Sequence, residues 1–284
     1  MHGLSLGARL RSAAGAAGLT LAGTFPLAAQ APGLGAAGEL VDPHHFRVCS
    51  DPNDLPFSNE AGQGFENKVA ELFAAKLNEP VTYAYFPQVI GFVRVTLNAL
   101  RCDVIMGMAV GTDIVQTTVP YYHTTYALVF RPDSALDGVS TLADARLKDK
   151  HIGVVAGTPP ATVMAQEGLL SLAKPYALTV DTRVEAPSKT MAEDVASGRI
   201  DAGVLWGPLA GYYAKQVTPH LVVVPLLHEK ERMDFLVAMG VRHTDQDWKR
   251  TLNRLITANQ PEINTILASY GVPLLDDQGR PITP

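Results

Sequence analysis

Residues 51–54 bring three polar side chains close together, those of Asp51, Asn53 and Asp54. A carboxylate accepts hydrogen bonds, exchanges protons in acid–base catalysis or coordinates a cation, and an amide both donates and accepts hydrogen bonds. The spacing does not fit a calcium-binding EF-hand loop, which needs further oxygen ligands and a late glutamate. We therefore expect these residues to bind a ligand, and we expect no metal ion and no cofactor.

A strand, a loop and a helix must position this group. Residues 46–49 are apolar and β-favouring, residues 50–56 contain two prolines and two aspartates, and apolar residues recur at helical spacing from Phe65 to Leu77. These patterns predict a buried strand, a loop and an amphipathic helix. Ligands of an open α/β sheet bind beyond the carboxyl ends of its strands. The loop and Phe57, which follows it, are thus expected at a binding crevice.

Further candidate ligand-binding residues stand at the ends of other predicted strands. Gln88 follows a strand predicted over residues 81–86, Met108 ends a second strand, and Trp206 ends a third. Trp206 could stack on a ligand, anchor a partner protein or fill the seam between two parts of the chain.

Tyr122 and Thr158 are candidates with two interpretations each. Tyr122 belongs to an aromatic run that could stack on a ligand or pack at a seam. Thr158 stands between a glycine and a proline at the start of a predicted helix. Its hydroxyl could help to bind an anion or could simply cap the helix. Residues 179–184 predict one more strand.

The two cysteines, Cys49 and Cys102, lie on segments predicted to be neighbouring strands. Neighbouring strands are about 4.8 Å apart, so a disulfide is within reach if the register matches. An even number of cysteines in an exported protein favours a disulfide, and two buried thiols are the alternative. Two sulfur ligands without paired histidines nearby do not complete a zinc site.

Composition and charge indicate a globular, exported protein. The 284 residues are 47% hydrophobic and 18% charged, with a net charge of −5 and no basic run, which argues against nucleic acid as a partner. Arg9 and Arg11 precede an apolar run and then small residues, so residues 1–31 are predicted to be a signal peptide. A membrane anchor is the alternative, but the run is short for about 30 Å of hydrocarbon. We expect a periplasmic protein that does not span the membrane.

The segment CSDPNDLPFSNEAGQGFENKVAELFA, residues 49–74, resembles the first strand–helix unit of periplasmic solute-binding proteins of the amino-acid-receptor type. More narrowly, it is similar to the solute-binding-like proteins encoded beside quinoprotein methanol dehydrogenases, the Mox/Xox J-type accessory proteins. RCDVIMGMAVGTD (101–113) matches a strand and loop of the receptors, and WGPLAGY (206–212) matches the accessory proteins. The resemblance covers residues 40–284.

The resemblance implies the type II periplasmic binding protein fold, with two α/β lobes joined by two crossing hinge segments. The first lobe is expected to comprise residues 40–133 and 235–284, and the second lobe residues 134–234.

The sequence departs from the amino-acid receptors at both charged clamps. It has no arginine in residues 102–130, where the receptors bind a ligand carboxylate, and it has Trp206 where they carry an aspartate for the ligand ammonium. The resemblance implies a non-enzymatic accessory protein of methanol oxidation that binds the PQQ-dependent dehydrogenase, a small ligand or both in an inter-lobe cleft. One alternative is the solute receptor of an ABC transporter. A dehydratase using Asp51, Asp54 and Glu66 is another, but a cationic clamp for an acidic substrate is missing.

Overall fold

The computed structural model describes residues 39–283, so the predicted signal peptide, residues 1–31, lies outside the described part. The strands are β1 (Phe46–Ser50), β2 (Asn53–Asp54), β3 (Ser58–Asn59), β4 (Val81–Tyr85), β5 (Val104–Ala109), β6 (Gln116–Phe130), β7 (Ile152–Val155), β8 (Lys174–Tyr176), β9 (Ala202–Trp206), β10 (Val222–Pro225) and β11 (Asp234–Val241). The α-helices are α1 (Phe65–Leu77), α2 (Phe92–Val95), α3 (Pro159–Gln166), α4 (Pro187–Ala196), α5 (Gly207–Gln216), α6 (Gln246–Ala258) and α7 (Gln260–Ser269). Within residues 39–283, no helix combines the length and apolarity that a membrane crossing requires.

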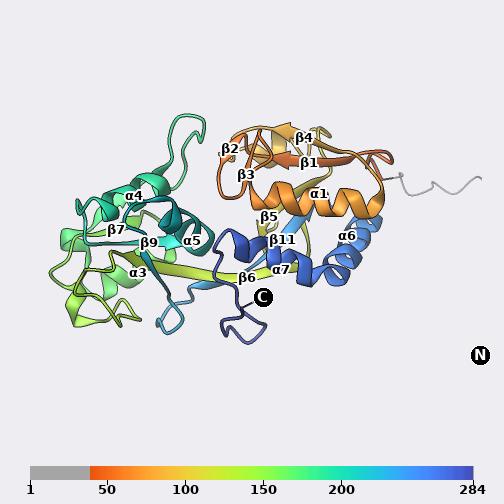
Figure 1. Cartoon of the computed structure of the whole chain (residues 1–284). Coiled ribbons are helices and arrows are strands. Elements are labelled where there is room, and N and C mark those ends of the chain that lie inside the picture. The colour runs from red at the N-terminus through yellow and green to blue at the C-terminus, as the bar shows by residue number, and fades with distance from the viewer. Residues whose placement is uncertain (1–38, 284) are drawn as a thin grey trace, which may run out of the picture. The chain divides into compact units, whose positions relative to one another are not determined.

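The long strand β6 connects two α/β halves of the chain (Figure 1). Strands are ordered β4-β1-β5-β11-β6-β9-β7-β8, and β10 also pairs with β6. Residues 116–125 of β6 pair with β11, whereas residues 126–130 pair with β9 and residues 127–130 with β10. We call the half built on β1–β5, α1, α2, α6 and α7 the first lobe, and the half built on β7–β10 and α3–α5 the second lobe. The exact limits between the lobes, after residues 133 and 234, remain a prediction.

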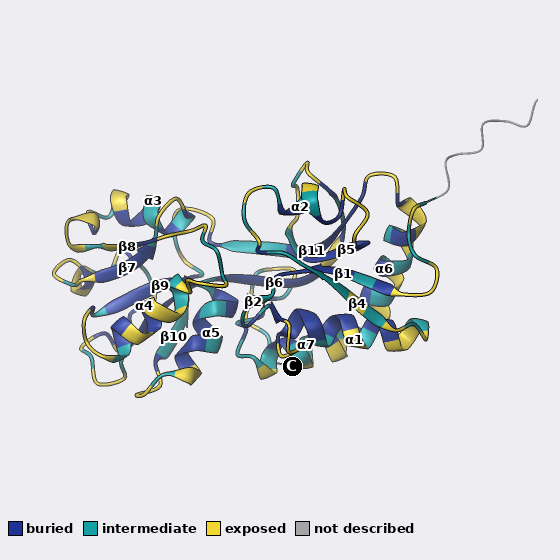
Figure 2. Cartoon of the chain, turned by 90° about the horizontal axis from the view of Figure 1, so that it is seen from above, coloured by how far each residue is buried: buried dark blue, intermediate teal, exposed yellow. Residues whose placement is uncertain are grey.

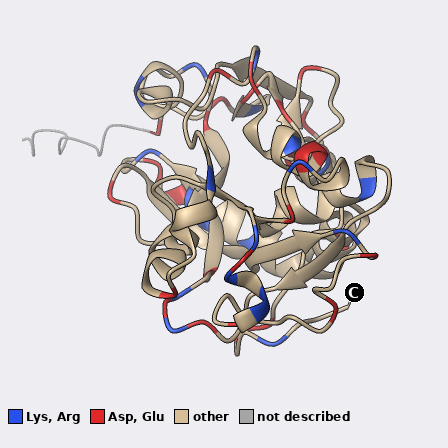
Figure 3. Cartoon of the chain, turned by 90° about the vertical axis from the view of Figure 1, so that its left-hand side faces the viewer, with Lys and Arg blue, Asp and Glu red and all other residues tan. Residues whose placement is uncertain are grey.

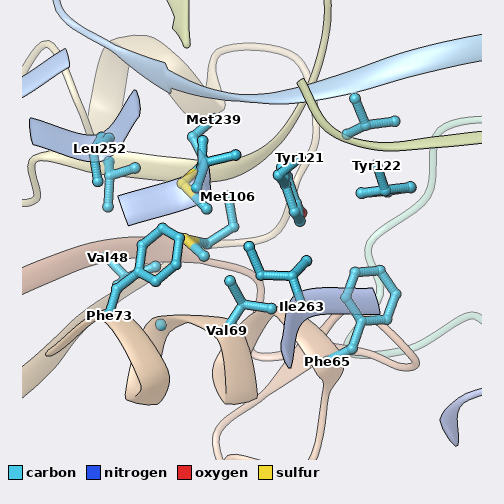
Figure 4. Packing of buried hydrophobic residues seen from close by; sticks show 14 of the residues in the cluster. Val48, Phe65, Val69, Phe73, Met106, Tyr121, Tyr122, Met239, Leu252 and Ile263 are labelled. Atoms are coloured by element: carbon cyan, nitrogen blue, oxygen red, sulfur yellow. The ribbon is translucent and has the colours of Figure 1, made fainter. Parts of the chain in front are cut away.

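Each lobe has its own hydrophobic core. In the first lobe the apolar face of α1 is buried as predicted, and Phe65, Val69 and Phe73 pack against side chains from the sheet and from α6 and α7 (Figure 4). Separate clusters around Leu128 and Met191 fill the second lobe. Burial of each large apolar side chain stabilises the folded state by about 1.5–3 kcal/mol relative to leaving that side chain exposed. The middle of β6, residues 121–125, is buried where the strand passes between the two halves (Figure 2).

The predicted disulfide between Cys49 and Cys102 is present, with Cα atoms 5.3 Å apart. Cys49 lies on β1, which pairs in parallel with β5. β5 begins at Val104, so Cys102 precedes this strand instead of beginning it. Both cysteines are buried, and the bond ties β1 to the segment that enters β5.

The prediction of a strand over residues 179–184 is wrong, because the structure has no strand there. β8 is the strand that pairs with β7 at the edge of the sheet, and after it the chain turns at Asp181. The carbonyl of Asp181 accepts hydrogen bonds from the N–H groups of Val184 and Glu185, and its carboxylate accepts from the Arg183 backbone at 3.1 Å. Such aspartate-centred turns override the strand preference of the residues around them. Residues 177–186 therefore form a loop, which we call the second-lobe loop.

Candidate binding cleft between the lobes

Asp51 fixes the shape of the loop after β1. One carboxylate oxygen accepts hydrogen bonds from the Asn53 N–H at 2.9 Å and the Thr182 hydroxyl at 2.7 Å, and the other accepts from the Gln88 N–H at 2.7 Å. A buried charge is stable only with such partners, and Asp51 is buried. Three donors already bind the Asp51 carboxylate, and Asp51 lines neither cavity described below. Its role is therefore to hold Asn53, Gln88 and Thr182 in place.

Polar contacts join the two lobes beside this loop. The Asn53 amide donates to the Thr182 carbonyl at 2.8 Å, and the Tyr213 hydroxyl donates to the Leu55 carbonyl at 2.8 Å. At Gly211 of α5, a Cβ atom would collide with the carbonyl of Gly271 at the end of α7. Glycine at position 211 thus allows the second lobe to approach the first backbone to backbone.

Two adjoining cavities form the cleft. The first, which we call the polar compartment, has a volume of about 230 Å³ and is lined in part by Asn53, Asp54, Thr158, Glu185 and Lys189. The second, the apolar compartment, has a volume of about 450 Å³ and is lined in part by Met108, Tyr122, Phe235 and Val237. Six residues line both compartments: Phe57, Gln88, Tyr126, Leu178, Trp206 and Leu209.

Aromatic rings of the connecting strands β6 and β11 meet the Trp206 ring of the second lobe. Its ring centroid lies 5.0 Å from that of Tyr126 on β6 and 5.9 Å from that of Phe235 on β11. Both contacts are edge-to-face, a favourable arrangement for aromatic pairs. Trp206 ends β9 and begins the turn into α5, so the strand directs its ring into the cleft.

The cleft also contains two carboxyl groups that are largely removed from water. Burial, followed by the charge of Asp51, raises the pKa of Asp54 to about 7. Burial, followed by the charges of Asp54 and Asp51, raises the pKa of Glu66 to about 8. Desolvation and like charges both favour the protonated form of an acid. At neutral pH the apolar compartment therefore holds a mostly protonated Glu66.

Eight of the nine predicted ligand-binding residues line one compartment or the other, and Asp51 is the exception. Glu66, Tyr126, Phe235 and the second-lobe loop were not among the predicted ligand-binding residues, although they line the cleft. Glu66 stands in the first turn of α1 and was predicted only as a possible acid–base residue of a dehydratase. The loop was missed because its residues predicted a strand.

The charges around the cleft differ from those of a site for an amino acid. Within residues 39–283 no arginine lines either compartment, and Lys189 is the one basic residue that does. The described part of the chain contains no group of three or more histidine, cysteine or acidic residues placed to hold a metal ion. In Figure 3 acidic and basic segments are interspersed on the face shown. Within the described residues, the cleft therefore offers a ligand aromatic surface, acidic groups and a single basic residue.

Comparison with known proteins identifies the family. No family model matches the chain. "Protein MoxJ" of Methylorubrum extorquens is 30% identical over 293 residues, which cover 94% of this chain and 97% of that protein. The chain belongs to the MoxJ family. The resemblance to J-type proteins is thereby confirmed.

Solved structures extend this MoxJ-family assignment to the fold. The crystal structure of the periplasmic binding protein XoxJ from Methylobacterium extorquens AM1 is 40% identical, with a TM-score of 0.71, and covers 82% of this chain and 100% of that one. The substrate-binding protein of an amino acid ABC transporter is 20% identical, with a TM-score of 0.55, and covers 80% of this chain and 98% of that one. The type II periplasmic binding protein fold predicted from the sequence is confirmed.

Proposed function

We propose that this MoxJ-family chain is a periplasmic accessory protein of a PQQ-dependent methanol dehydrogenase and acts in methanol oxidation by binding, without catalysing a reaction. In this proposal the protein contacts the dehydrogenase through the rim of the inter-lobe cleft, and the cleft takes a small ligand. The main support is the family membership combined with a cleft whose centre is aromatic. Large, partly buried aromatic residues are the usual anchors of protein–protein interfaces.

Trp206 is the residue that we propose as the anchor. It lines both compartments and touches Tyr126 and Phe235, so a partner that reaches it would cover a continuous aromatic surface. Exposed apolar residues lie on the loops near the cleft mouth, among them Leu178, 61% exposed, on the second-lobe loop. Apolar side chains around an aromatic anchor exclude water from an interface.

The second candidate function is that of a solute receptor for an ABC transporter. The observation that favours it is the cleft itself, because two adjoining cavities between lobes suit a small organic molecule. The missing arginine clamp argues against a simple amino acid as the solute. A dehydratase activity is disfavoured for a similar reason, since an acidic substrate would need a cationic clamp, and Lys189 in the polar compartment is the one basic residue that lines the cleft in the described part of the chain.

Co-purification from periplasm tests the accessory function. We expect the affinity-tagged protein to retain the quinoprotein methanol dehydrogenase of the same cells and Trp206→Ala to retain much less. Truncation of an aromatic anchor costs about 2 kcal/mol or more, which is about a 30-fold loss of affinity. Leu170→Ala is the control, because Leu170 is an exposed apolar residue of the second lobe that does not line the cleft.

A screen of solutes by thermal shift separates the two candidate functions. A ligand at 100 times its dissociation constant stabilises its receptor by about 2.7 kcal/mol. If the dehydrogenase fails to co-purify and a transported solute gives such a shift, the accessory function is wrong and the transporter receptor is right.

A further inference from the structure

The Glu66 carboxyl lines the apolar compartment and has no partner within the described residues. The Glu66 side chain lines the apolar compartment although only 6% of the residue is exposed. Among residues 39–283, no hydrogen bond or ion pair reaches this carboxyl, and the causes of its raised pKa are burial and neighbouring acids alone. Buried polar groups in folded proteins nearly always have a partner. The Glu66 oxygens are not among the fully enclosed side-chain atoms and border the cavity, so a ligand in the apolar compartment can supply their partner.

Neighbouring elements make room for this carboxyl. Gly107 on β5 faces it, and a Cβ atom at position 107 would collide with a Glu66 carboxylate oxygen. Glu66 stands in the first turn of α1, but the N–H groups of Phe65 and Glu66 donate to the carbonyls of Pro56 and Phe57 at 2.8 and 2.9 Å. These two N–H groups of the helix end are therefore not free to bind an anion.

The charges that face Glu66 favour a cation. Asp54 and Asp51 lie near it on the loop after β1, and its other titratable neighbours are tyrosines on β4 and β6, Tyr83, Tyr121 and Tyr122. From the second lobe, Glu185 and Lys189 line the adjoining polar compartment. Arg232 lies over the Phe235 ring, 5.4 Å from its centroid, and does not line the apolar compartment. Within the described residues, the acids of the cleft outnumber its single basic residue.

The rest of the apolar compartment suits the alkyl groups of such a cation. Its wall includes the rings of Phe57, Tyr122, Tyr126, Trp206 and Phe235. Aromatic rings attract an ammonium group through the negative face of the ring, and cages of this kind bind quaternary ammonium ligands. The Glu66 carboxylate in the same cavity would pair with the positive charge of the ammonium group.

We propose that the apolar compartment binds a small organic ammonium cation, with the charge against the Glu66 carboxylate and the alkyl groups against the aromatic rings. The cavity of about 450 Å³ has room for an alkylammonium or a trialkylated amino alcohol. Binding requires Glu66 to ionise, because the cation favours the charged carboxylate. Each bound cation therefore releases a proton below the pKa of Glu66. This inference rests on the proposed function only in taking the cleft as a binding site.

Calorimetric titration of the purified protein alone tests the inference, with choline and n-butylammonium as probes. The control ligands are their uncharged counterparts, 3,3-dimethylbutan-1-ol and butan-1-ol. At about pH 9 we expect at least one ammonium probe to bind tenfold or more tightly than its alcohol. The affinity should fall by up to about tenfold per pH unit below about pH 8. Buffers of different ionisation enthalpy should report about one proton released per cation near pH 7.

Variants assign the effect to Glu66. Glu66→Gln should lower the affinity for the ammonium probe at least tenfold at about pH 9 and remove most of the pH dependence. Glu262→Gln removes an equal charge from the surface of α7, where Glu262 is exposed and pairs with Lys76 at 3.6 Å, and should leave the affinity unchanged. The inference would be overturned if the ammonium probes and their alcohols bound with equal affinity, or if neither ammonium probe bound. It would also be overturned if Glu66→Gln bound the ammonium probe as tightly as the wild type. The titration contains no dehydrogenase, so its failure would leave the accessory function standing.

Discussion

Glu66→Gln is expected to raise the free energy of unfolding by about 5 kcal/mol at about pH 9 and by less than about 1 kcal/mol at about pH 5. The reason is the cost of a buried carboxylate. The pKa of Glu66 rises from 4.5 to about 8 on folding. One pKa unit corresponds to about 1.4 kcal/mol between the two protonation states. Glutamine has a similar shape and carries no charge at either pH.

The direction of the pH dependence follows from proton binding. Between about pH 4.5 and pH 8 the folded protein holds the Glu66 proton that the unfolded chain has lost. The state that binds more protons is favoured at low pH, so the stability of the wild-type protein falls as the pH rises through this window. Asp54, whose pKa is about 7, acts in the same direction and leaves a smaller slope in the variant.

Urea unfolding at a series of pH values, on the wild type and the variant, measures the effect. Glu71→Gln is the matched control on the same helix, because Glu71 is exposed and pairs with Lys68 at 3.1 Å. It should change the stability by less than about 1 kcal/mol at every pH. If Glu66→Gln had the flat, small effect of Glu71→Gln, Glu66 would be in contact with water or with a positive partner, and the description of the apolar compartment would be wrong.

Loss of the disulfide is the second large effect that we expect. The bond joins residues separated by 53 positions. Closing a loop of this length removes entropy from the unfolded chain and stabilises the protein by about 4 kcal/mol. The double variant Cys49→Ala/Cys102→Ala should lose at least this amount, since both residues are buried and truncation also leaves space in the core.

Urea unfolding with and without dithiothreitol tests the disulfide. Reductant should destabilise the wild type and leave the double variant unchanged, because the variant has no bond to reduce. The wild type can be fully unfolded and refolded in the presence of dithiothreitol. If its free energy of unfolding were then unchanged, the disulfide would contribute little to stability.

Local sequence patterns predicted the first lobe well. The helical spacing of Phe65, Val69 and Phe73 predicted α1, because one apolar face of a helix must be buried. The segment between β1 and α1 was predicted as a loop from its prolines, which lack an N–H, and its aspartates, which hydrogen-bond to nearby backbone. The short strands β2 and β3 within it were not predicted. The cysteines could be paired because two cysteines allow one pairing and their predicted strands were neighbours.

The missing parts of the cleft depend on contacts between distant residues. Thr182 donates to Asp51 across 131 positions, and no local pattern reports such a contact. A turn at Asp181 places Thr182 there, and the surrounding β-branched residues predicted a strand instead. Glu66 was named only as a possible acid–base residue of the dehydratase alternative, and it was left out of the predicted ligand-binding residues for a related reason. An acid in the first turn of a helix is common on protein surfaces, and only the tertiary packing of β5 and β6 shows that this one is buried.

Titration of purified quinoprotein methanol dehydrogenase with the purified protein tests the proposed function most directly. Calorimetry or light scattering should show a saturable complex, and Trp206→Ala should weaken it about 30-fold, whereas Leu170→Ala should not. Absence of any complex at protein concentrations up to about 100 μM, with both proteins folded, would contradict the proposal that this MoxJ-family protein acts by binding the dehydrogenase.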